Sequence, residues 1–106
     1  MLEAALADAQ RWEFDLPADA GLKRARELFA GLAFEIHDVS SFEVDVAVDG
    51  AIGITTGSPN VSISVTVAPN GSRTDAGAVD HRKRKVIWTS ENPSIEEIVR
   101  EIGRAA

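Results

Sequence analysis

Cysteine does not occur in this chain of 106 residues, which excludes disulfide bonds and thiolate chemistry. Histidine is scarce as well, and the sequence has only His37 and His81, too few for the usual ligand set of a zinc site. No apolar run approaches the roughly 20 residues that a membrane helix needs, and residues 1–5 lack the basic start of a secretory signal. These absences predict a cytoplasmic protein without a metal ion, a cofactor or a membrane span.

Positive charge is in short supply, and the formal net charge is −6. Residues 1–53 carry 11 acids and 4 bases, a net of −7, whereas residues 54–106 carry 6 acids and 7 bases, a net of +1. An acidic chain repels phosphate backbones, so binding to nucleic acid is disfavoured. The uneven charge leaves room for self-association through complementary surfaces, and simple solubility is the alternative explanation.

The rest of the composition is typical of a globular protein, with 44% hydrophobic and 26% charged residues. A chain of this length fits one domain and buries enough surface for one core. We therefore expect a single domain over residues 1–106.

Apolar residues at helical spacing mark three helices. We place them at residues 1–10, 17–31 and 94–104, the first of them short. Gly31 is expected to end the second helix. Ser94 and Glu97 have the spacing of a capping box at the start of the third.

Six segments are predicted strands, five of them from the alternation of apolar and polar residues that is typical of a strand with one buried face and the last from a short apolar run. They lie at residues 12–16, 34–37, 42–48, 52–54, 61–67 and 82–89. Asp49 and Gly50 form a hairpin signal of two residues, because both positions tolerate positive φ. Residues 73–81 are small or polar apart from Val79, and we expect a loop or a ragged edge strand there.

These segments predict an α+β fold with a single, mainly antiparallel sheet of five to six strands. The helices at 17–31 and 94–104 each have one apolar stripe, so both should pack on one face and leave the other to hydroxyl and carboxyl groups. Trp12 and Trp88, in the first and last predicted strands, are expected to help fill the core. The alternative is an exposed aromatic anchor at an interface.

The segment Phe14-Asp15-Leu16-Pro17-Ala18-Asp19, followed by a helix that ends at Leu28-Phe29, resembles the opening of START-like helix-grip domains. The resemblance covers the element order of about residues 12–104. It implies a binder of lipids or other hydrophobes, with a curved sheet closed by a C-terminal helix. This chain is shorter than a full domain of that family and its last helix is brief, so the resemblance implies a reduced version. No binding residue carries over from it.

A ligand pocket, if the resemblance holds, would lie between the sheet and the helix at 94–104. The residues predicted to line it are apolar: Phe34, Phe42, Val44, Ile54, Val65, Trp88 and Ile98.

A run of five cationic or titratable residues is the sharpest local feature, and consists of His81, Arg82, Lys83, Arg84 and Lys85. Such a run could bind an anionic ligand or an acidic partner. The alternative is a set of solvated charges that lead into a strand and discourage edge pairing. Aromatic residues for stacking bases are absent beside it, which argues against single-stranded nucleic acid.

Two rows of polar residues on predicted strands are candidate sites. Glu43 and Asp45 could act as an acid–base pair if one were buried, and Ser62, Ser64 and Thr66 could offer hydroxyl groups to a ligand. No histidine or lysine lies at a spacing that indicates activation of a serine. Solvated faces of the sheet explain both rows more simply.

No catalytic constellation emerges from these residues, so we expect no enzyme. The leading hypothesis is a non-enzymatic interaction module that forms a homodimer or binds a partner protein through free sheet edges. The alternative is binding of a lipid or small hydrophobic ligand. A third hypothesis is an enzyme centred on His37 or on Glu43 and Asp45.

Overall fold

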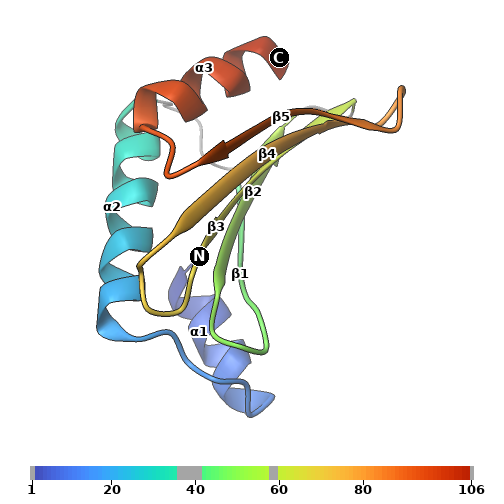
Figure 1. The fold of residues 1–106 in the computed structure, drawn as a ribbon. Coiled ribbons are helices and arrows are strands. Elements are labelled where there is room, and N and C mark those ends of the chain that lie inside the picture. Colours follow the sequence, from blue (N-terminus) through green and yellow to red (C-terminus); the bar gives the residue numbers. More distant parts are fainter. Residues whose placement is uncertain (1, 36–41, 58–59, 106) are drawn as a thin grey trace.

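The computed structural model of the chain describes residues 2–35, 42–57 and 60–105 (Figure 1). Within these ranges the helices are α1 (Leu2–Arg11), α2 (Asp19–Glu35) and α3 (Ile95–Ala105). The strands are β1 (Glu43–Val46), β2 (Ile52–Gly57), β3 (Val61–Val67), β4 (Thr74–Asp80) and β5 (Lys85–Glu91). They form one antiparallel sheet in the order β1-β2-β3-β4-β5, so each strand pairs with its neighbour along the chain. The predicted α+β class with an antiparallel sheet is confirmed.

The strand register divides the sheet into an inner face, which the helices cover, and an outer face. Ile54 of β2 pairs with Val65 of β3, and both side chains are buried on the inner face. One residue further along, Thr55 pairs with Ser64, which places hydroxyl groups on the outer face. Because side chains alternate along a strand, this single register gives the sheet one apolar and one polar side.

Helices α2 and α3 lie over the inner face (Figure 1) and contribute fully buried side chains to the core. Leu28 and Leu32 of α2 and Ile98 of α3 are at most 1% exposed. Removing a side chain of this size from water contributes roughly 1.5–3 kcal/mol. α1 joins the same core through buried Ala9, and Leu2 packs against it. The two helices predicted on one face are thus present, with α1 as a third.

Gly31 does not end α2, contrary to the prediction, because the helix continues to Glu35. A Cβ atom at Gly31 would overlap Cδ1 of Ile95 in α3, so the small size of this glycine lets the two helices approach each other. The strand predicted at 34–37 is also wrong where it can be compared, since Phe34 lies within α2. The remainder of that segment lies outside the described residues.

Residues 12–16 form no strand, again contrary to the prediction. α1 ends in a Schellman motif, in which the amide of Phe14 donates a hydrogen bond to the carbonyl of Ala9 at 2.9 Å. Glu13 between them has a φ of 58°, the left-handed conformation that this motif requires. Trp12 is consequently 69% exposed and does not fill the core.

β4 lies between β3 and β5, so residues 73–81 form neither a loop nor an edge strand. Its inner-face side chains are Thr74, Ala76 and Ala78, which are buried but small. The large β-branched and aromatic residues that are typical of strands are missing here. The small size of these side chains hid the strand from the sequence pattern.

The β1–β2 hairpin turns at Asp49 and Gly50 as predicted, but its loop has three residues. The amide of Ala47 donates to the carbonyl of Ala51 at 2.8 Å, which leaves Val48, Asp49 and Gly50 outside the ladder. Gly50, and not Asp49, takes the positive φ, at 90°. A turn followed by a left-handed glycine is the common way to close a three-residue hairpin.

Candidate functional site

The outer face of the sheet is open, since the helices all lie on its other side (Figure 1). Ser64 and Thr66 of β3 are exposed on this face and Ser62 is half-buried. Glu43 and Asp45 of β1 share the face and are exposed. The two polar rows therefore lie where the alternation placed them, on a solvated surface.

His37 lies outside the described residues, whereas His81 is the first residue of the turn between β4 and β5. Its Nε2 atom lies 3.0 Å from the hydroxyl oxygen of Ser62, a contact that the sequence spacing did not indicate. A catalytic pair of this kind needs a third group that orients the histidine, and His81 is exposed at the surface. Within the described part of the chain, no group of three His, Asp or Glu side chains could hold a metal ion.

The basic run forms the tip of the β4–β5 hairpin, and we call residues 81–85 the basic tip. All five residues are exposed, and the tip projects beyond the rest of the sheet in Figure 1. Oδ1 of Asp80 accepts hydrogen bonds from the amides of Arg82 at 2.9 Å and Lys83 at 3.1 Å, which fixes the turn. The bond from Lys83 is the main reason that the pKa of Asp80 is lowered. Arg84 completes the turn with a φ of 51°.

β5 lies at one edge of the sheet. It pairs with β4 on one side, and no other described strand pairs with the edge on its other side. Val86 is 58% and Ile87 46% exposed, although both occupy strand positions. The register with β4 shifts here, because Val79 pairs with Val86 and Ala78 with Trp88. Ile87 is therefore the extra residue of a β-bulge. It lines a hollow of about 150 Å³ beside Ala78 of β4 and Arg104 of α3, whereas Val86 shares the outer face with Val79.

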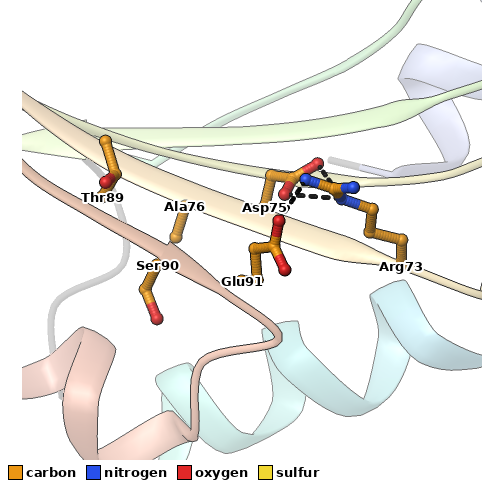
Figure 2. A pocket seen from close by; sticks show the side chains of 6 residues that line it. All are labelled: Arg73, Asp75, Ala76, Thr89, Ser90 and Glu91. Carbon is orange, nitrogen blue, oxygen red and sulfur yellow. Dashed lines mark hydrogen bonds and ion pairs between the residues drawn. The ribbon is translucent and has the colours of Figure 1, made fainter.

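The other end of β5 carries a small ion-pair cluster (Figure 2). Nε of Arg73 donates to both carboxylate oxygens of Asp75, at 2.9 and 3.0 Å, and its Nη2 donates to Oε1 of Glu91 at 2.7 Å. The hydrogen bond to Asp75 is the largest reason that the pKa of Arg73 is raised. Asp75 and Glu91 are direct cross-strand partners, and Arg73 relieves the repulsion between them.

A shallow hollow of about 510 Å³ surrounds this cluster and is lined by Arg73, Asp75, Ala76, Thr89, Ser90 and Glu91 (Figure 2). The carboxylates of Asp75 and Glu91 face the single guanidinium of Arg73, so the end of β5 carries a net negative charge. This hollow is therefore suited to a cation rather than to an anionic ligand.

The residues predicted to line a ligand pocket meet in the packed core. Phe42, Ile54, Val65 and Ile98 are buried there, and Val44 and Trp88 pack against them. The side chain of Phe34 is outside the described part. The hollow beside Val44 and Ile54 measures about 10 Å³, room for about one water molecule. Binding of a hydrophobic ligand stays a prediction, as does the resemblance to helix-grip domains.

An open groove of about 510 Å³ between α1 and α2 was not foreseen from the sequence. Leu6, Leu16 and Leu22 line it, and the ion pair between Glu3 and Arg26, at 3.4 Å, joins the two helices. The sequence does not indicate this groove, because Leu16 alternates with polar residues and so predicts a strand.

Comparison of the chain with protein families, with curated proteins and with solved structures finds no match. None of the described helices is long and apolar enough to cross a membrane. β5 combines several exposed features: cations at its start, two exposed apolar side chains, an edge that no other described strand pairs with, and carboxylates at its end.

Proposed function

We propose that this protein is a non-enzymatic interaction module that binds a protein strand along the free edge of β5. The observation that carries the proposal is the exposure of Val86 and Ile87 on an edge strand. An edge strand presents amide and carbonyl groups that an added strand can pair with, and side chains beside it supply specificity. The bound strand comes from a second copy of the chain or from another protein.

Sheet edges that stay unpaired usually carry features that prevent pairing with other chains. The edge of β5 has such features only in part. Lys85 at its start and the bulge at Ile87 both discourage indiscriminate pairing. Val86 and Ile87, by contrast, present apolar surface next to the free backbone groups. This combination favours a selective partner over general aggregation.

The test compares association of the native chain with that of Ile87→Lys by analytical ultracentrifugation up to about 1 mM, the range of weak contacts. We expect the native chain to associate and the variant to stay monomeric, because a charge on the edge opposes strand pairing. Val48→Lys is the matched control, since Val48 is also exposed, at 67%, but lies in the β1–β2 hairpin loop. Circular dichroism verifies that each variant is folded.

A native chain that stays monomeric over this range, together with unchanged amide exchange along residues 85–91 in the presence of candidate partner strands, would overturn the proposal. Equal loss of association in both lysine variants would also count against the β5 edge, because it would show a general effect of charge.

A further inference from the structure

The hollow of about 150 Å³ that Ile87 lines lies between α3 and the inner face of the sheet. Val61, which also lines it, pairs with Asp80, so the hollow is at the end of the sheet that carries the basic tip. The sheet contributes three apolar side chains and the helix a carboxylate and a guanidinium: Val61, Ala78, Ile87, Glu101 and Arg104. A cavity of about this size can hold one benzene molecule, so one short organic group fits.

The carboxylate in this hollow is unusual because it is buried. Among the described residues, Glu101 is the only charged residue that is buried, with a side chain 10% exposed. It follows the fully buried Ile98 by three positions and therefore lies beside it, at the border of the apolar stripe of α3. Nη1 of Arg104 donates a hydrogen bond to its Oε1 at 3.0 Å, and no other described residue donates to this carboxylate. A carboxylate accepts several hydrogen bonds, so Glu101 has capacity for a further donor.

The sign of charge that the hollow favours follows from the burial of Glu101. The side chain of Arg104 is 69% exposed, so water and salt screen its charge more than they screen the buried carboxylate. Attraction between two charges is about four times as strong at an effective dielectric constant of about 20 as it is in bulk water. Asp80 and Lys85, which are cross-strand partners at this end of the sheet, have opposite charges that largely offset each other. The hollow is therefore suited to a cation.

We propose that this hollow binds a primary alkylammonium group, with its chain against Ala78 and Ile87 and its nitrogen at the carboxylate of Glu101. The alkyl chain removes apolar surface from water, and the ammonium group has three donors. A wholly apolar ligand would bury the carboxylate further without supplying a donor, and an anion would lie against the buried negative charge. A lysine side chain of another protein and a free alkylamine both present this chemistry. The backbone groups of the β5 edge take no part, so the site does not depend on the proposed function.

Titration with n-butylammonium chloride, followed by amide chemical shifts in NMR spectra, tests the site. We expect saturable shifts at Ala78, Ile87 and Glu101 and a dissociation constant of about 1–10 mM, because a ligand of so few atoms binds weakly. 1-Butanol has the same alkyl chain without the charge and should bind about tenfold more weakly, because it lacks the charge-assisted hydrogen bond. Sodium chloride at equal concentration controls for ionic strength.

Two substitutions on α3 should change the affinity for n-butylammonium in opposite directions. Glu101→Gln keeps the size of the side chain but removes its charge, and should weaken binding about tenfold without changing the affinity for 1-butanol. Arg104→Gln removes the competing guanidinium and should strengthen binding several-fold. Glu96→Gln, the same change at an exposed position in the first turn of the helix, is the matched control and should bind as the native chain does. Because Arg104 is exposed, Arg104→Gln provides a test even if Glu101→Gln does not fold.

A capped lysine, Nα-acetyl-lysine methylamide, distinguishes the two sources of the ammonium group. An affinity equal to that of n-butylammonium or higher supports a lysine of a partner protein, whereas binding of n-butylammonium alone supports a free amine.

Several results would overturn the inference. They are equal affinities for n-butylammonium and 1-butanol, an unchanged affinity in Glu101→Gln, a weaker one in Arg104→Gln, and the absence of saturable shifts up to about 50 mM. Binding of butyrate that is lost in Arg104→Gln would show an anion site instead. These titrations and the ultracentrifugation of the lysine variants succeed or fail separately, so the failure of one proposal is distinguished from that of the other.

Discussion

Two glycines stand where the start of α2 meets the β3–β4 turn. A Cβ atom at Gly21 would overlap the carbonyl oxygen of Pro69, and one at Gly71 would lie 2.6 Å from the carbonyl oxygen of Ala20. Gly71 also has a φ of 72°, which disfavours any side chain. The amide of Ala18 donates to the same Pro69 carbonyl at 2.9 Å. The helix and the turn are thus held in contact through their backbones.

Replacement by alanine should change the free energy of unfolding in opposite directions at Gly21 of α2 and at Gly103 of α3. Gly21→Ala forces a methyl group against a backbone carbonyl that cannot turn aside, and we expect the free energy of unfolding to fall by about 1–3 kcal/mol. Gly103→Ala in α3 meets no atom within 4 Å. It should raise the free energy of unfolding by up to about 1 kcal/mol, because alanine favours a helix. Urea unfolding of the two variants beside the native chain measures both; a stabilised Gly21→Ala would refute the close contact.

At the scale of elements, the β4–β5 hairpin owes its turn to one carboxylate. Asp80 accepts two backbone amides and lies beside the cations of the basic tip, so the pKa of its carboxyl is lower in the folded chain than the ordinary 3.8. A depressed folded pKa means that the ionised carboxylate stabilises the hairpin above pH 4. The stabilisation is lost as the pH falls through the folded pKa.

Asp80→Asn should accordingly destabilise the hairpin at pH 7, and the difference from the native chain should vanish well below pH 4. Urea unfolding at a series of pH values gives this difference directly, and amide exchange at Lys83 localises it. Asp8→Asn is a useful comparison at pH 7. Oδ1 of Asp8 lies 4.0 Å from Nη1 of Arg11 in an exposed ion pair, and such pairs contribute little to the free energy of unfolding. A constant difference between Asp80→Asn and the native chain from pH 7 to pH 2 would refute the role of the charge.

The elements that the sequence predicts well are those with large apolar side chains at regular spacing. Residues 61–67 coincide with β3, and the helix expected at 94–104 matches α3 to within a residue. Ser94 caps α3 as expected, accepting the amide of Glu97 at 3.1 Å. The errors lie where local backbone closure or small side chains decide the structure, as at the end of α1 and along β4.

The candidate site was predictable in part. A run of cations is visible in any sequence, but its place at a hairpin tip depends on β4, which the pattern did not show. Likewise, Val86 and Ile87 predicted a strand, but the strand order and the bulge are needed to show that it lies at an edge. The place of the basic tip and the edge position of β5 both depend on which strands lie side by side, and the identity of these residues alone does not determine that order.

At the scale of the whole molecule, the self-association that the proposed function allows would link stability to protein concentration. A dimer that only folded chains can form is favoured at higher concentration, so the unfolding equilibrium shifts by mass action. The helices cover one side of the sheet, and β5 adds its edge to the surface available for a second copy. If two copies pair through this edge, the free energy of pairing therefore adds to the free energy of unfolding.

The thermal midpoint should consequently depend on protein concentration. We expect it to rise by a few degrees for each tenfold increase above the dissociation constant in the native chain, and to stay constant in Ile87→Lys. Differential scanning calorimetry at about 10 µM to 1 mM covers the range in which weak protein contacts form. A midpoint independent of concentration in the native chain would contradict a dimer linked to folding.

The sequential strand order has a kinetic consequence as well. Each strand has its neighbour in the chain as its neighbour in the sheet, so the sheet can assemble hairpin by hairpin and close only short loops at each step. Longer closures come when the start of α2 meets the β3–β4 turn at Gly21 and Pro69, and when α3 meets α2 at Ile95 and Gly31, 64 positions apart in the chain. Pairing between strands that are neighbours in the chain favours fast assembly of the sheet, whereas the contacts between α2, α3 and the β3–β4 turn close longer loops and are expected to slow the folding of the whole chain.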